Sequence, residues 1–319
     1  MKAPVSKDEV TDISVVLCSY NRKQSLLGTL ESLAKSKTQS DVRWEVLVVD
    51  NNSTDGTDTA VRDFVRQGHE NFRYIFEPRQ GKGFALNSGV RAARGRIIAF
   101  TDDDAIVSQD WLTTLVKEFE ADPALRCVGG MVALHNPNDL PVTIRTSSIR
   151  QEVSWANFNL LDIPIIGCNV AFRATVFGEL GPYDDRFGPG AGVVPSGADM
   201  DFIYRTCRSG MRMIYVPQAV VSHNHGRTTE AEIESLNRRY LVGRGGFYCK
   251  HVLAGDLYVT RMALREFYWI AREWFGEWRR GLPTDKPLER ARLLRKGIGM
   301  FMQLRRQVPG QVSPQVIHA

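Results

Sequence analysis

The first hundred residues alternate between short, continuously apolar runs and segments with helical spacing, and this alternation restricts the possible fold more than any other feature. Strands that are apolar at every position are buried on both faces, as in a parallel sheet covered by helices. The expected strands are residues 13–17, 44–49, 72–76 and 96–100, and the expected helices between them are 23–35, 57–67 and 84–94. The pattern predicts an α/β fold with a doubly wound, mostly parallel sheet.

The rest of the chain divides into a mixed region and a helical one. Between residues 110 and 225, helices are expected at 111–120 and 196–208, with strands at 127–134, 165–173 and 213–216. Beyond residue 228 the spacing is helical, over 230–250, 256–280 and 286–307. We therefore expect one α/β domain over residues 1–226 and a C-terminal helical region over 227–319.

Three polar clusters directly follow expected strands. Residues 18–22 read CSYNR, residues 50–56 read DNNSTDG, and Asp102, Asp103 and Asp104 follow the fourth strand. The carboxyl ends of strands in a doubly wound sheet meet in one crevice, where ligands bind. The sequence therefore predicts that these clusters converge on a single site.

Three adjacent carboxylates repel one another unless a cation or a row of donors compensates them. Mg²⁺ and Mn²⁺ prefer oxygen ligands and commonly bridge protein carboxylates to phosphates. Asp102, Asp103 and Asp104 thus indicate a divalent metal site, the alternative being a solvated acidic turn. Asp50 ends the second strand, where an acid often accepts hydrogen bonds from a nucleoside. The alternative is a purely structural role, because residues 50–56 are also typical turn-forming residues.

Other features of the sequence exclude several classes of protein. The sequence Gly81-Lys82-Gly83 precedes a helix and suits an anion, but it matches neither the dinucleotide fingerprint nor the P-loop. The five cysteines are far apart and form no CxxC pair, so we expect a reducing, cytoplasmic setting and no zinc ribbon. The net charge of +5 suits anionic partners, yet no nucleic-acid-binding motif occurs. No apolar run is long enough to span a bilayer.

Taken in order, the motifs closely resemble those of glycosyltransferase family 2. They are residues 16–22 (VLCSYNR), 48–57 (VVDNNSTDGT), 81–87 (GKGFALN), 95–104 (GRIIAFTDDD), 167–173 (GCNVAFR), 181–187 (GPYDDRF) and 197–202 (GADMDF). The resemblance covers about residues 13–225. It implies a glycosyltransferase-A fold, a nucleotide-sugar half over 11–105, an acceptor half over 106–226, and transfer with inversion at the anomeric carbon.

The resemblance also implies site roles. Tyr20 and Asp50 would contact the base and ribose, Lys82 would lie near the diphosphate, and Asp104 with Asp102 or Asp103 would bind the metal and donor. Ser19, Arg22 and Asn52 complete the expected donor site, and Asn169 and Asp201 are candidate acceptor residues. Trp155 is a further acceptor candidate, because an aromatic ring suits the apolar face of a sugar; core packing is the alternative. His223 is expected to complete the metal shell, with His225 a weaker candidate; a purely structural role is the alternative.

The resemblance implies that Asp199 is the general base, and an inverting displacement does need a carboxylate near the attacking hydroxyl. The alternative is that Asp199 and Asp201 only complement the positive end of a helix. The family's glutamate before this aspartate is Ala198 here, so one orienting contact is missing or supplied from elsewhere.

The expected function is transfer of a sugar from a nucleotide-diphosphate sugar, with a UDP-sugar favoured, to a carbohydrate or lipid-linked carbohydrate in polysaccharide or glycoconjugate synthesis. The alternatives are a non-catalytic nucleotide- or carbohydrate-binding protein and, less favoured, a sugar nucleotidyltransferase. The aromatic and arginine residues of 256–280 suit either a membrane interface or packing on the core or a second subunit, so peripheral attachment and a homodimer both stay open.

Overall fold

The computed structural model describes residues 11–39, 41–190 and 192–307. Within it the chain forms two compact units. The sheet unit comprises Met1–Tyr183 and Phe202–Thr228, and the helical unit comprises Asp184–Asp201 and Thr229–Ala319. The predicted boundary at 226/227 lies two residues before the last of these junctions, which falls between Thr228 and Thr229. The segment 184–201, however, groups with the C-terminal helices, which the sequence pattern does not indicate.

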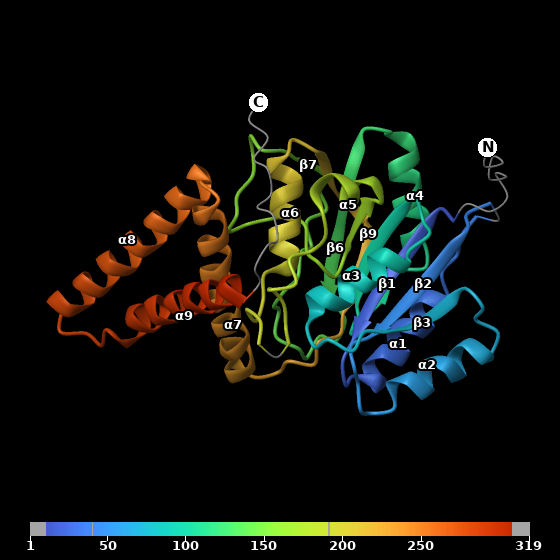
Figure 1. The fold of residues 1–319 in the computed structure, drawn as a ribbon, viewed down its shortest axis with the longest axis horizontal. Coiled ribbons are helices and arrows are strands. Elements are labelled where there is room, and N and C mark those ends of the chain that lie inside the picture. The colour runs from blue at the N-terminus through green and yellow to red at the C-terminus, as the bar shows by residue number, and fades with distance from the viewer. Residues whose placement is uncertain (1–10, 40, 191, 308–319) are drawn as a thin grey trace. The chain divides into compact units, whose positions relative to one another are not determined.

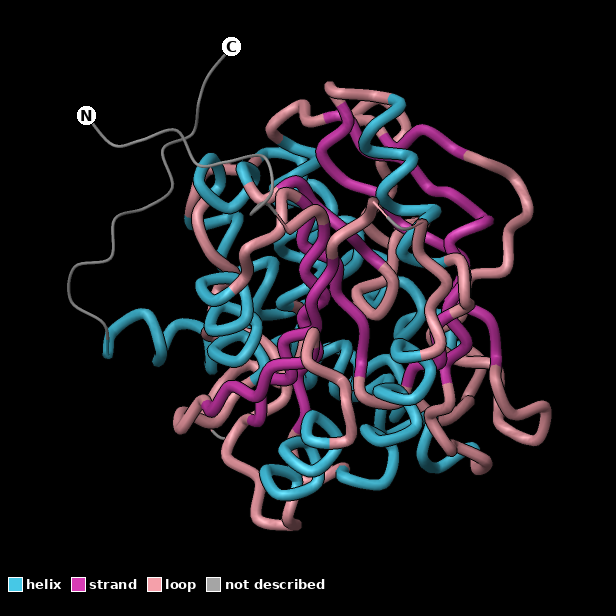
Figure 2. Tube along the Cα trace, turned by 90° about the vertical axis from the view of Figure 1, so that its right-hand side faces the viewer, coloured by secondary structure: helices cyan, strands magenta, loops and turns pink. Residues whose placement is uncertain are grey.

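The described part of the sheet unit contains a nine-stranded sheet in the order β3-β2-β1-β4-β8-β6-β9-β5, with β7 also paired to β9 (Figure 1). The strands twist relative to one another, as the tube view shows (Figure 2). Their bounds are β1 Ile13–Ser19, β2 Trp44–Asp50, β3 Phe72–Phe76, β4 Ile97–Asp102, β5 Ala105–Val107, β6 Leu125–Leu134, β7 Gln151–Val153, β8 Val170–Arg173 and β9 Arg212–His223.

The sheet is mixed rather than mostly parallel. Strands β1 to β4 pair in parallel as predicted, but β8 lies antiparallel between β4 and β6, and β5 and β7 both pair antiparallel with β9. The short strands β5 and β7 and the short helix α5 (Thr175–Leu180) were not predicted, because three to six residues are too few for a periodic signal.

Four helices of the sheet unit begin and end within two residues of their predicted positions. They are α1 Lys23–Ala34, α2 Thr57–Arg66, α3 Lys82–Ala92 and α4 Trp111–Ala121. Helix α3 packs on β1 and β2, whereas α4 packs on β6 and β9. The strand residues between them, such as Val15, Leu17 and Val48, are fully buried. Burial on both sides explains why these strands are apolar at every position.

The described part of the helical unit contains the start of α6 (Ala198–Arg208) and three long helices, α7 Glu230–Leu253, α8 Leu257–Arg279 and α9 Asp285–Gln307 (Figure 1). Thr229 and Glu232 form a capping box at the start of α7. Helices α7 and α9 approach closely at glycines: a Cβ atom on Gly297 would lie only 1.8 Å from the carbonyl oxygen of Val242. None of the described helices has the length and apolarity needed to cross a membrane.

The contact between α3 and β1 depends on a glycine. A Cβ atom on Gly89 would lie 2.3 Å from a methyl carbon of Val16, so Gly89→Ala overpacks the buried α3–β1 contact. We expect it to lower the free energy of unfolding by about 1–3 kcal/mol. Gly28→Ala in α1 is the matched control, because its Cβ atom meets only ordinary contact at 3.9 Å and a helical alanine is favoured by about 1 kcal/mol. Urea unfolding measures both; equal effects would contradict the packing argument.

Candidate functional site

The register of the parallel strands brings the predicted polar clusters together. Ser19 in β1 lies opposite Asp50 in β2, and Cys18 lies opposite Asp102 in β4. All three clusters therefore stand at the carboxyl edge of adjacent strands, as expected for a doubly wound sheet.

Cations and donors compensate the three adjacent aspartates. The Arg22 guanidinium donates to Asp103 Oδ1 at 2.8 Å and to Asp104 Oδ2 at 2.7 Å. The hydroxyl of Ser19 donates to Asp103 Oδ2 at 2.7 Å, and Lys82 Nζ lies 2.7 Å from Asp102 Oδ1. Ser19 and Arg22, at and just after the end of β1, and Lys82, at the start of α3, thus offset a charge cluster that would otherwise be costly to bury.

Two of the aspartates share their surroundings with a histidine. In the β5–β9 ladder His223 lies opposite Ala105, which brings its ring beside Asp104. Asp102, Asp104 and His223 each offer a ligand atom, and these atoms lie within 4.8 Å of one another. Asp104 Oδ1 is buried and lacks a well-aligned hydrogen bond, although His223 Nε2 lies 3.2 Å away. Two carboxylates, an imidazole and an unsatisfied oxygen fit Mg²⁺ or Mn²⁺.

The pKa values of these groups differ because their partners differ. Burial alone would raise the pKa of Asp104, but His223 and Arg22 outweigh it and lower that pKa well below the ordinary value. Burial raises the pKa of Asp103 to about 6, despite the opposing charge of Arg22. For His223, burial opposes the charged form, but the Asp104 carboxylate raises the imidazole pKa.

His225 occupies a different environment. Its Nδ1 accepts the backbone N–H of Arg227 at 3.0 Å and lies 3.5 Å from a carboxylate oxygen of Asp139. Burial and the neighbouring His223 lower the pKa of His225. The group that could hold a metal ion includes His223 and not His225.

On the expected nucleoside side, Asp50 is buried and already has partners. Its carboxylate accepts from the backbone N–H of Ser53 at 2.9 Å and from the Tyr74 hydroxyl at 2.8 Å. Tyr20 is 48% exposed, so its ring has a free surface for stacking. Asn52 is also exposed and has a left-handed backbone conformation, with φ of 66°, as in a turn.

Asn51 is a positioning residue that the sequence did not single out. Its buried side-chain amide donates to the carbonyls of Glu77 and Arg79, and its Oδ1 accepts from the backbone N–H of Gly81 at 2.8 Å. These bonds fix the loop that leads into α3 and so set where Lys82 begins that helix. Within a run of turn-forming residues, nothing in the sequence distinguishes this asparagine from Asn52.

The predicted acceptor residues of the sheet unit have structural contacts. Asn169 is fully buried, donating to the carbonyls of Met131 and Ala219 and accepting from the Trp111 indole. These bonds hold β6, β9 and α4 together around the residue that precedes β8. Trp155 is 37% exposed and packs beside Tyr204 and under the Arg208 guanidinium.

In the helical unit, Asp199 and Asp201 lie in the first turn of α6. Asp199 is partly exposed, whereas Asp201 is fully buried. Asp201 Oδ1 lies 2.7 Å from Lys250 Nζ and 2.9 Å from His251 Nε2, both on α7. Lys250 also lies 2.8 Å from Asp184, which in turn pairs with Arg186. This network ties the segment that carries Asp199 to helix α7.

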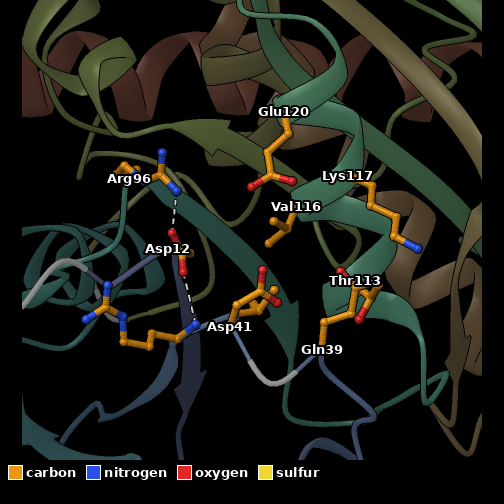
Figure 3. A pocket seen from close by; sticks show the side chains of 10 residues that line it. Asp12, Gln39, Asp41, Arg96, Thr113, Val116, Lys117 and Glu120 are labelled. Atoms are coloured by element: carbon orange, nitrogen blue, oxygen red, sulfur yellow. Dashed lines mark hydrogen bonds and ion pairs between the residues drawn. The ribbon is translucent and has the colours of Figure 1, made fainter. Parts of the chain in front are cut away.

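A hollow of about 220 Å³ lies beside the amino ends of β1 and β4, whereas the aspartates follow the carboxyl end of β4. Figure 3 shows the side chains that line it. Asp12, just before β1, pairs there with Arg96, just before β4. Gln39, Asp41, Thr113, Lys117 and Glu120 also line it. The hollow is polar and lies at the amino ends of the strands, away from the crevice where such sheets bind ligands.

A parallel half-sheet whose carboxyl edge carries polar loops and a candidate metal site has the architecture in which open α/β sheets bind ligands. The sequence profile described as "Glycosyl transferase family 2" matches residues 14–181, more than half of the chain. The protein belongs to that family and is a glycosyltransferase.

Relatives and solved structures agree with this assignment. "Glycosyltransferase AglE" of Haloferax volcanii is 28% identical over 234 residues, which are 73% of this chain and 72% of that protein. "Succinoglycan biosynthesis protein ExoO" of Rhizobium meliloti is 31% identical over 57% of this chain and 50% of that protein.

The fold matches the mannosyltransferase PcManGT of Pyrobaculum calidifontis, solved with GDP-Man and Mn²⁺, with a TM-score of 0.59 at 20% identity over 95% of this chain and 77% of that one. It also matches Staphylococcus aureus TarS, solved with UDP-GlcNAc, with a TM-score of 0.57 at 16% identity over 93% and 92%. The glycosyltransferase-A fold predicted from the sequence is confirmed.

The buried ion pairs of Lys250 should contribute measurably to the free energy of unfolding. Burial opposes ionisation of Asp184, but Lys250 and then Arg186 outweigh it and lower the pKa of that carboxyl. Lys250→Met removes a charge that both Asp184 and Asp201 contact, so we expect a loss of about 3 kcal/mol at neutral pH. Because the pKa of Asp184 is lowered on folding, its contribution is present above the unfolded carboxyl pKa, about 4, and is lost as the pH falls further.

Arg66→Met is the matched control, since it removes the exposed Arg66–Asp63 pair and should cost at most about 1 kcal/mol. Denaturant unfolding of both variants at neutral and acidic pH measures the difference. Equal losses in the two variants, or a Lys250→Met loss that stays constant in acid, would contradict a buried, charged network.

Proposed function

We propose that this glycosyltransferase is an inverting, Mg²⁺- or Mn²⁺-dependent enzyme that takes a sugar from a nucleotide-diphosphate sugar. The observation that carries the proposal is the group formed by Asp102, Asp104 and His223, in which a buried oxygen of Asp104 lacks a hydrogen bond. Asp103 is instead held by Arg22 and Ser19, so we assign the metal to Asp102 and Asp104. A bound cation would neutralise charge on the diphosphate leaving group.

The chain's own residues would bind the rest of the donor. Lys82 and Arg22 are the cations nearest the aspartates and would attract the diphosphate. Exposed Tyr20 offers a ring on which a base can stack, and Asp50, with Asn52 beside it, lies at the edge expected for the ribose. A UDP-sugar is the favoured donor, since TarS is solved with UDP-GlcNAc, although PcManGT is solved with GDP-Man.

We assign the general base to Asp199. The acceptor hydroxyl would lose its proton to this carboxylate as its oxygen forms a bond to the anomeric carbon, while the bond to the diphosphate oxygen breaks on the opposite face. Lys250 and His251 would act as positioning residues for the turn that bears Asp199, through Asp201. The acceptor is a carbohydrate or lipid-linked carbohydrate, and we place the enzyme on the cytoplasmic side in polysaccharide or glycoconjugate synthesis.

One observation favours a second candidate, a non-catalytic nucleotide-binding protein. Ala198 stands where the family motif has glutamate, and its side chain is buried. An alanine cannot orient an acceptor or a base by hydrogen bonding. Binding without turnover would support this second candidate.

The proposed metal site predicts that nucleotide binding depends on a divalent cation. Calorimetric titration with UDP, GDP and dTDP, each with Mn²⁺ and then with EDTA, should show binding of one nucleotide that depends on the cation. Asp104→Asn should weaken Mn²⁺ binding more than about tenfold, a loss above about 1.4 kcal/mol. Asp110→Asn, an exposed carboxyl before α4, is the matched control and should leave binding unchanged. Binding that EDTA does not affect would overturn the metal assignment.

Replacement of Asp199 distinguishes a glycosyltransferase from a non-catalytic nucleotide-binding protein. Asp199→Asn removes the proposed base, so transfer should fall by about a hundredfold or more, while nucleotide affinity should stay within about twofold. Glu230→Gln, an exposed carboxyl at the start of α7, is the control and should transfer normally. Sugar transfer to a panel of saccharide acceptors measures both. Unchanged transfer in Asp199→Asn would assign the base to another residue.

A further inference from the structure

Helix α8 presents one face on which apolar residues and arginines alternate. Leu257, Arg261, Leu264, Tyr268, Arg272, Phe275 and Arg279 recur at intervals of three or four residues, which places them on one side of the helix. Arg265 and Trp278 flank this row. We call these nine residues the α8 face; it extends over about 35 Å, the length of a 23-residue helix.

No part of the chain that the structure describes covers the α8 face. Leu257 is 71% exposed, Leu264 67% and Trp278 61%, although large apolar side chains are ordinarily buried. All four arginines of the helix are exposed as well. Scattered apolar residues need no explanation, but a continuous exposed stripe of this kind marks an interaction surface.

The acidic residues of α8 lie away from this face. Glu266 accepts from Arg244 and Tyr248 of α7, and Glu273 accepts from Arg290 of α9. The side that carries these glutamates also carries the buried Val259 and Ile270, by which the helix packs in its unit. Charge is therefore segregated: Glu266 and Glu273 pair within the helical unit, and the arginines of the α8 face are left for something outside it.

We infer that the α8 face docks on an anionic bilayer surface. Leucine, tyrosine, phenylalanine and tryptophan enter the interface between headgroups and acyl chains, where aromatic rings are favoured. Arginine stems lie along the same apolar layer while their guanidinium groups reach lipid phosphates. The Arg272 guanidinium already stacks on Trp269, and that of Arg279 lies over Phe275, so charge and ring are presented together.

A second copy of the chain fits this face less well. In a two-fold contact the same patch meets itself, so the four arginines of each copy would share one interface with no carboxylate from either face. Like charges brought together at an interface are costly. The inference does not rest on the proposed function, because it uses only residues of the helical unit.

The test is sedimentation of the full chain with vesicles of phosphatidylcholine alone and of phosphatidylcholine mixed equally with phosphatidylglycerol. We expect binding to the anionic vesicles, a blue shift of tryptophan emission on binding, and release at high salt. Arg261→Glu with Arg265→Glu should weaken binding by about thirtyfold or more, given about 1 kcal/mol for each basic residue near such a surface. Leu264→Ser with Phe275→Ser should also weaken it.

Lys35→Glu with Arg66→Glu is the matched control, since both side chains are exposed in the sheet unit and the change in net charge is the same. It should alter vesicle binding by less than about twofold. Urea unfolding of every variant shows that it is folded, and nucleotide titration tests the proposed function independently. The inference fails if anionic vesicles do not bind the chain, or if the α8 variants bind like the control. It also fails if sedimentation in lipid-free buffer shows a dimer that Leu264→Ser with Phe275→Ser abolishes.

Discussion

The compensation of three neighbouring carboxylates is the constraint on which the site depends. Asp103 and Asp104 are almost fully buried, and a buried carboxylate is tolerated only with charged or hydrogen-bonding partners. Arg22 contacts both of them, Ser19 donates to Asp103, and His223 lies beside Asp104. Lys82 pairs with the less buried Asp102. These partners come from the end of β1 and the residues just after it, from the start of α3 and from the end of β9, so the carboxyl edge of the sheet holds together around these charges.

The geometry also divides labour among the three aspartates. Asp103 accepts from both Arg22 and Ser19, and its burial raises the pKa to about 6. Asp104 has one oxygen on Arg22 and the other beside His223, without a hydrogen bond. A metal ion at Asp104 would bind the oxygen that lacks a hydrogen bond. A metal ion at Asp103 would instead have to displace Arg22 or Ser19. For this reason the proposed metal site uses the outer two members of the run.

The helical unit follows a similar principle with different groups. Asp201 has no exposure and is satisfied by Lys250 and His251, two consecutive residues of one helix. The first turn of α6 is therefore attached to α7 by charge, while α7 and α9 approach through glycines. What remains on the outside is the α8 face, whose arginines have no acidic neighbours on their own side of the helix.

Local pattern by itself determined the parallel half of the sheet, because a strand buried on both faces must be apolar throughout and a covering helix must have a period near 3.6. It also placed Asp102, Asp103 and Asp104 at a strand end. The motifs then indicated the family. Only the tertiary structure decided which partner each aspartate has, that Asn51 fixes the loop before α3, that Asn169 is buried, and that residues 184–201 group with the C-terminal helices. Those outcomes depend on contacts between residues far apart in the chain, and no periodicity records them.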